Sequence, residues 1–278
     1  MDRRTFIGTT AGALLTGSAT RVLASVVDND RLGPIGLQLY TVREQMKASV
    51  PQTLAAVAKA GYKEVEFAGY FGHPAADIRK MLDDLGLKAP SSHVQMADLG
   101  TGWGAMLDYA KTVGHEYLVC AWIDAEERTL PGYTKIAARF NEAGEAARQQ
   151  GLKFGYHNYF FEFTPTDGVL PYDFLLRECD PQNVAMEIDV FWMKKGGADP
   201  VTYMKNFPGR FPMLHVKDMG PPPEFAMMDV GKGTIDWKKI FEAGETGGVK
   251  HAFVEHDETK DPDETMKASY RYLRSLRY

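Results

Sequence analysis

The chain has 278 residues, of which 44% are hydrophobic, 12% aromatic and 25% charged, and its formal net charge is −5. This composition is typical of a globular protein and excludes a disordered or low-complexity chain. The length suits either two small domains or one α/β barrel of about 250 residues. No linker rich in Ser, Gly or Pro divides the sequence.

The first 24 residues have the layout of a secretory signal. Arg3 and Arg4 precede a mildly apolar stretch over 7–15, and the small residues near Ala24 offer a cleavage site. This order predicts a twin-arginine signal peptide over residues 1–24 and a periplasmic or otherwise exported protein. The alternative is a frayed N-terminal arm. The apolar stretch is too short to span a bilayer, so we expect no membrane attachment after cleavage.

Loss of this segment would remove three arginines and one aspartate and change the net charge from −5 to −7. An acidic protein is a poor electrostatic match for a phosphate backbone. We therefore expect no nucleic-acid partner.

From residue 33 onward, strand-like segments alternate with segments of helical periodicity. Strands are expected over 35–42, 63–69, 88–95, 116–122, 153–160, 184–193, 210–218 and 251–257. Helices are expected over 50–62, 74–87, 102–114, 133–152, 171–180, 199–209, 236–248 and 264–276.

Several helices end in Gly, one or two residues before the next strand, as in "AGYKEV", "VGHEYL" and "GGVKHA". That is the joint between helix and strand in a parallel sheet. Eight such units predict a single-domain (β/α)8 TIM barrel over residues 33–278, rather than an open doubly wound sheet. No G-x-G-x-x-G follows the first strand, and "DVGKGTIDW" is interpreted as a loop turn.

Two cysteines, Cys120 and Cys179, lie in apolar surroundings. We interpret both as buried free thiols, with one disulfide as the alternative. The sequence has no C-x-x-C motif, so nothing points to a thiolate-bound zinc.

Polar side chains gather where the predicted strands end, which is the mouth of a barrel and the usual place of its active site. Charges converging there would repel one another, and a divalent cation removes that cost. Carboxylates and imidazoles without thiolate suit Mn²⁺, Mg²⁺, Co²⁺ or Fe²⁺, with Zn²⁺ as a further alternative. Asp189, His215 and Glu255 form the best ligand set. The residues expected at the mouth are Gln38, Tyr40, Glu66, Ser92, His93, Trp122, His157, Asn158, Glu187, Asp189, His215, Lys217, Asp218, Glu255, His256 and Asp257.

From Ile35 to the C-terminus the chain resembles the xylose-isomerase-like superfamily of sugar isomerases and epimerases. The stretches that carry the resemblance are "GLQLYTVRE", "GYHNYFFEF", "MEIDVFWMKKGGADPV", "GRFPMLHVKD", "VGKGTIDWKKIF" and "FVEHD". The resemblance implies metal ligands Glu, Asp, His and Glu from strands five to eight. Asp189, His215 and Glu255 match the last three. His157 stands in place of the first Glu, so the resemblance gives no clean fourth ligand, and one glutamate of a two-glutamate proton shuttle is missing.

The predicted roles follow from this match. Glu255 is a ligand and the catalytic acid or base, and His157 is a ligand and catalytic candidate, with an outer position behind the ligands as its alternative. Asp189 is expected to face the barrel axis, and Glu187 to point to the opposite face and pair with a Lys or Arg. The predicted substrate contacts are Gln38, Tyr40, Glu66, His93, Asn158, Lys217 and Trp192.

Alternatives stay open for several of these side chains. Lys217 and Asp218 could form an ion pair at the rim. Glu66 and His93 could instead be exposed on loops. Four aromatic residues could form an apolar wall for a sugar ring or could simply be packed in the core: Trp122, Trp192, Tyr40 and Phe160.

The sequence therefore predicts a divalent-metal-dependent sugar isomerase or epimerase that uses enediolate proton transfer on a keto-sugar or cyclitol. One alternative is a metal-dependent lyase or dehydratase acting on 3-keto-glycosides or inosose-like substrates. Further alternatives are an exported sugar-binding protein and a phosphodiester hydrolase, which the acidic charge opposes. The partner expected is a small sugar; the oligomeric state is left open, with a homo-oligomer among the alternatives.

Overall fold

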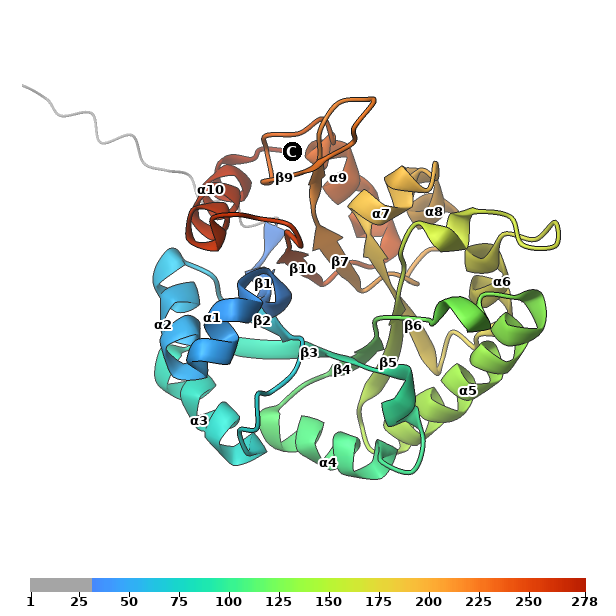
Figure 1. Ribbon diagram of the computed structural model, residues 1–278, viewed down its shortest axis with the longest axis horizontal. Helices are drawn as coiled ribbons and strands as arrows, with labels where there is room; N and C mark the ends of the chain where they lie inside the picture. The colour runs from blue at the N-terminus through green and yellow to red at the C-terminus, as the bar shows by residue number, and fades with distance from the viewer. Residues whose placement is uncertain (1–31) are drawn as a thin grey trace, which may run out of the picture.

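The computed structural model describes residues 32–278, so the predicted signal segment over 1–24 lies outside the described residues. Eight parallel strands form a closed barrel in the order β1-β10-β7-β6-β5-β4-β3-β2, with the helices in an outer ring (Figure 1). The predicted TIM barrel is confirmed. The barrel strands are β1 Ile35–Gln38, β2 Glu64–Phe67, β3 Lys88–Val94, β4 Tyr117–Cys120, β5 Lys153–His157, β6 Val184–Asp189, β7 Met213–Val216 and β10 His251–Val254.

The outer helices begin and end at the capping residues that the sequence predicts. Ser49 caps α2 by accepting a hydrogen bond from the Gln52 backbone N–H, and Gly61 ends α2 with a left-handed φ of 112°. The helices are α1 Arg43–Ala48, α2 Val50–Ala60, α3 Ala75–Leu85, α4 Trp103–Val113, α5 Leu130–Gln149, α6 Pro171–Glu178, α7 Val190–Lys195, α8 Pro200–Asn206, α9 Trp237–Gly247 and α10 Pro262–Ser275. A small antiparallel ribbon joins β8 Asp218–Met219 to β9 Met227–Met228.

Two predicted strands are shorter than expected because a side chain at the strand end caps the next turn. The Gln38 side chain accepts a hydrogen bond from the Tyr40 backbone N–H, so β1 stops there and Leu39–Val42 form a 3₁₀ turn. The Asp189 carboxylate likewise accepts from the Trp192 backbone N–H at 2.8 Å and starts α7. Each strand thus ends at a polar residue of the barrel mouth.

The layer between the barrel and the helices is apolar and buried, whereas the barrel interior also holds buried polar side chains. Cys120 and Cys179 are both free and buried, as predicted. Among residues 32–278, no helix is long and apolar enough to cross a membrane.

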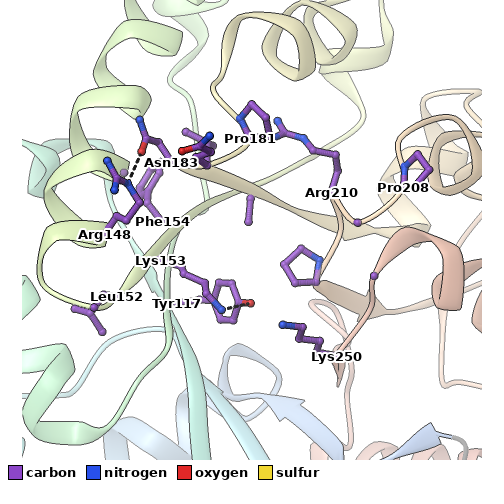
Figure 2. A pocket seen from close by; sticks show the side chains of 18 residues that line it. Tyr117, Arg148, Leu152, Lys153, Phe154, Pro181, Asn183, Pro208, Arg210 and Lys250 are labelled. Atoms are coloured by element: carbon purple, nitrogen blue, oxygen red, sulfur yellow. Dashed lines mark hydrogen bonds between the residues drawn. The ribbon is translucent and has the colours of Figure 1, made fainter.

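A cavity of about 560 Å³ lies at the amino-terminal end of the barrel (Figure 2). Four cationic residues line it, and no Asp or Glu from the described part of the chain does. Lys153 donates a hydrogen bond to the Tyr117 hydroxyl at 3.2 Å there. The site residues predicted from the sequence do not line this cavity, so the candidate site is at the opposite end. The cationic lining residues are Arg148, Lys153, Arg210 and Lys250.

Candidate metal centre

Four predicted ligands come together at the carboxyl end of neighbouring strands. His157 ends β5, Asp189 ends β6, His215 lies in β7, and Glu255 directly follows β10. Asp189 is in register with His215 across the β6–β7 pair. All four side chains are buried, and each offers one ligand atom within 4.8 Å of the others. β5, β6, β7 and β10 are successive neighbours in the barrel wall, and this order is what gathers the four side chains.

The facing atoms of this group lie close together without hydrogen bonds. His157 Nε2 is 3.4 Å from Asp189 Oδ2, and His215 Nδ1 is 3.8 Å from the same oxygen. His215 Nδ1 is also 2.6 Å from Glu255 Oε2. Of these four atoms, the two imidazole nitrogens have no hydrogen-bond partner within the described part of the chain. Buried polar atoms are normally paired, so these two nitrogens lack the partner that their chemistry requires, whereas the carboxylate oxygens face the Lys217 ammonium.

A divalent cation fits this arrangement. Two ligands bound at about 2.1 Å to one ion lie roughly 3.0–3.4 Å apart at the usual angles. The observed separations of 2.6–3.8 Å bracket that range. Two imidazoles and two carboxylates are a suitable donor set for Mn²⁺, Co²⁺, Fe²⁺ or Zn²⁺.

Lys217 supplies the positive charge next to these ligands. Its Nζ lies 2.9 Å from Asp189 Oδ2 and 2.7 Å from Glu255 Oε2, and it donates a hydrogen bond to Asp257 at 3.1 Å. Burial alone would raise the pKa of Asp189 and of Glu255, but the Lys217 ammonium lowers both below their usual range. Both carboxylates are therefore ionised at neutral pH.

His157 is neutral, in contrast to the two ionised carboxylates. Its burial, together with the charge of His215 nearby, lowers the pKa of its imidazole to about 4. The ring is therefore neutral at neutral pH, which is the form in which histidine binds a metal.

A second group of polar side chains lies directly beneath the first. His215 Nε2 is 2.6 Å from Glu66 Oε2, and His93 Nε2 is 3.0 Å from Glu187 Oε2. Glu66 also accepts hydrogen bonds from Gln38 at 2.7 Å and from the Ser91 hydroxyl. These contacts occupy most of the lone pairs of the Glu66 carboxylate.

The expected outward orientation of Glu187 is wrong. Its carboxylate is fully buried inside the barrel and contacts His93 and His215, while Asp189 faces the same interior. Residues two apart on a strand share a face, so Glu187 and Asp189 had to point the same way.

The predicted ion pair between Lys217 and Asp218 is replaced by other contacts. The Asp218 carboxylate accepts hydrogen bonds from four backbone N–H groups and the Trp237 indole, all 2.8–3.2 Å away. Asp218 therefore organises the loop over 229–237, and that stretch is the loop turn that the sequence predicted.

A pocket of about 500 Å³ opens above the ligands at the barrel mouth. His93, His157 and Glu255 reach it from below, and Asp257 lies at its side. Tyr40 and Trp122 line it, each about 40% exposed, whereas Trp192 and Phe160, the other two candidates for an aromatic wall, do not line it. The further aromatic residues of the pocket are Tyr70 and Tyr159.

Several predicted substrate contacts lie outside this lining. Gln38 and Glu66 are buried beneath the ligands, and Lys217 is buried beside them. Asn158 holds the β5–β6 junction, because its side chain accepts from the Asp189 backbone N–H at 3.1 Å. Trp192 lies behind Tyr159, with ring centroids 5.4 Å apart.

Sequence reasoning did not assign Tyr70 or Ser91 to this region. Tyr70 follows β2 in an ordinary loop, and Ser91 lies within a strand of weak pattern. The signal that could have found Ser91 is its place two residues before His93, on the same strand face.

Comparison with known proteins is consistent with this geometry. The family model of the xylose isomerase-like TIM barrel matches residues 54–276. The chain belongs to this family. A search of curated proteins returns no match.

Solved structures extend the comparison. This family member is similar to a sugar phosphate isomerase/epimerase from Parabacteroides distasonis ATCC 8503, at 27% identity over 87% of this chain and 93% of that chain, with a TM-score of 0.75. A second structure with the same description and source is 29% identical over 86% and 96% of the two chains, with a TM-score of 0.74. An IOLI protein with a bound zinc atom is 16% identical over 86% and 96%, with a TM-score of 0.69, which shows the shared fold alone.

Proposed function

We propose that this protein is a divalent-metal-dependent enzyme that isomerises or epimerises a small keto-sugar or cyclitol through an enediolate. The observation that carries the proposal is the meeting of four ligand atoms, from two imidazoles and two carboxylates, next to an open pocket that His157 and Glu255 line. His157, Asp189, His215 and Glu255 would hold the ion. Bound there, a divalent cation polarises a carbonyl and acidifies the neighbouring C–H.

Glu255 is the group proposed to move the proton. Its carboxylate lines the pocket and stays ionised beside Lys217, so it can accept a proton from the carbon next to the substrate carbonyl. Asp257 lines the same pocket and shares Lys217 with it. The Asp257 carboxylate can return a proton to another carbon of the enediolate or to its opposite face. It would then take the role of the second glutamate of the proton shuttle, which this chain replaces by His157.

The lining favours an unphosphorylated sugar. Three carboxylates, from Asp98, Glu255 and Asp257, line the pocket, and no Lys or Arg of residues 32–278 does. A phosphate dianion would be repelled there, whereas hydroxyl groups can donate to the carboxylates. Trp122 and Tyr159 offer ring surfaces against which the C–H face of a sugar can pack. The export that the N-terminal segment predicts would agree with such a substrate, because sugar phosphates are scarce outside the cytoplasm.

A lyase is the second candidate, because His157 stands where a proton-shuttling glutamate is expected. The same proton abstraction by Glu255 would then be followed by loss of a leaving group on the β-carbon. The proton need not be returned to carbon in that reaction, so one carboxylate is enough.

The test is a screen of keto-sugars, their phosphates and 3-keto-glycosides with metal-loaded and chelator-treated protein. We expect turnover of an unphosphorylated substrate that chelator abolishes and Mn²⁺ or Co²⁺ restores. Product analysis separates the two candidates, because an isomer keeps the substrate mass and a lyase product does not. Full turnover in excess chelator would contradict both.

A further inference from the structure

The imidazole of His215 has two nitrogens in two different surroundings. Nδ1 faces the candidate ligands and lies 2.6 Å from Glu255 Oε2, with no hydrogen bond. Nε2 points the other way, down into the barrel, and lies 2.6 Å from Glu66 Oε2. One ring therefore connects the metal centre to a buried carboxylate on the far side of the barrel interior.

We propose that Glu66 is a positioning residue, which accepts the Nε2 proton of His215 and so leaves the Nδ1 lone pair free to bind the metal. This inference rests on the proposed metal site, and goes beyond it by assigning a role to a residue that is no ligand itself. Histidine binds a metal as the neutral imidazole, which has one proton, and the nitrogen that keeps this proton cannot bind the ion. A carboxylate behind a metal-bound histidine fixes that choice.

The contacts of Glu66 show why it acts as an acceptor here. Gln38 donates to its Oε2 at 2.7 Å, and the Ser91 hydroxyl donates to its Oε1. Both groups come from neighbouring strands and fix the carboxylate in place. With His215 as the third donor, Oε2 has two hydrogen bonds, which leaves it no lone pair for an ion.

The positions of the strands explain how the residue reaches His215. Glu66 lies in β2 and His215 in β7, separated by 149 residues in the sequence and both fully buried. They meet across the interior of the closed barrel, whose inward side chains share one space. His93 Nε2, 3.3 Å from Glu66 Oε2, fills the remaining side of this contact.

The chain contains a matched control two residues away. Glu64 lies on the same strand, is buried, and its Oε2 is 2.8 Å from His251 Nδ1. That pair belongs to the amino-terminal end of the barrel, where Glu64 and His251 line a different cavity. Glu64→Gln therefore removes a buried glutamate–histidine contact without touching the metal centre.

The experiment measures Zn²⁺ and Co²⁺ affinity by calorimetry for the full chain and for the Glu66→Gln and Glu64→Gln variants. We expect Glu66→Gln to weaken the Kd about 10- to 100-fold, and Glu64→Gln to leave it within about twofold. Equal affinities for all three proteins would overturn the positioning role while leaving the metal site intact. No metal binding by the wild-type chain would overturn both this role and the proposed function. Metal binding that Glu66→Gln weakens, without any sugar turnover by the loaded protein, would overturn the proposed function alone and leave the role supported.

A second measurement needs no variant. In the Zn²⁺-loaded wild-type protein, the ¹⁵N shifts of the His215 ring should show a protonated Nε2 and a metal-bound Nδ1. The reverse assignment would overturn the proposal. Two ions per chain would also overturn it, because Glu66, His93, Glu187 and His215 could then hold the second ion through Nε2.

Discussion

Glu162 offers a sharp test of the electrostatics around the site. It lies in the short turn after β5, fully buried, and accepts a hydrogen bond from the Tyr159 backbone N–H at 3.0 Å and another from the Tyr156 hydroxyl. Burial raises the pKa of its carboxyl from 4.5 to about 7. The folded protein therefore keeps a proton at pH 6 that the unfolded chain releases.

The sign and size of the effect follow from proton linkage. Between about pH 4.5 and 7 the folded state binds more protons than the unfolded state, so the free energy of unfolding falls as pH rises. A shift of about 2.5 pKa units at about 1.36 kcal/mol each corresponds to roughly 3 kcal/mol across that window. The glutamine in Glu162→Gln cannot titrate. The free energy of unfolding of this variant, relative to that of the wild-type protein, should therefore rise by about that amount as the pH increases from 4.5 to 7.

Urea unfolding of both proteins at a series of pH values from 4.5 to 8 measures this difference in the free energy of unfolding. The contributions of the other titrating groups are the same in both proteins and cancel in the difference. Glu224→Gln, the same substitution at an exposed position, is the control. A flat curve for Glu162→Gln, or one that falls with pH, would refute the argument that burial dominates at this residue.

Three further outcomes are expected. Lys217→Gln leaves two buried carboxylates and the half-buried Asp257 carboxylate without their ammonium, and it should destabilise the metal-free protein by about 3–5 kcal/mol. Urea unfolding with and without Co²⁺ should show that the ion restores part of the loss, and an unchanged midpoint would contradict this. Gly233→Ala would place Cβ 2.3 Å from Asp218 Oδ1 and 2.5 Å from the Met219 carbonyl oxygen, and should cost about 1–3 kcal/mol. Gly104→Ala, in α4 with nothing within 4 Å, should instead stabilise by about 0.5–1 kcal/mol, so similar losses in the two variants would argue against a steric cause. Replacing Arg3 and Arg4 by lysine should stop export in a host with a twin-arginine system, and fractionation with N-terminal sequencing near residue 25 checks both the route and the cleavage site.

Much of the fold followed from local pattern. Alternating strand and helix segments, with Gly61, Gly114 and Gly248 at helix ends, predicted eight units and hence the closed barrel. The candidate ligand positions could also be predicted, because Asp189 and Glu255 are acidic residues at the ends of largely apolar strands. Buried apolar strands that end in charge are unusual enough in a sequence to be recognised.

The sequence by itself determined which polar residues stand at or near the carboxyl ends of the barrel strands, because strand ends are marked by short-range polarity and by the caps that follow them. Only the tertiary structure decided what those residues do: Glu66 and Gln38 lie beneath the ligands, Lys217 lies among them, and Asp218 holds a loop. The physical reason is barrel closure. Contacts such as Glu66 to His215 join strands that no local pattern relates, and the direction of each side chain depends on the stagger of the strands as they meet.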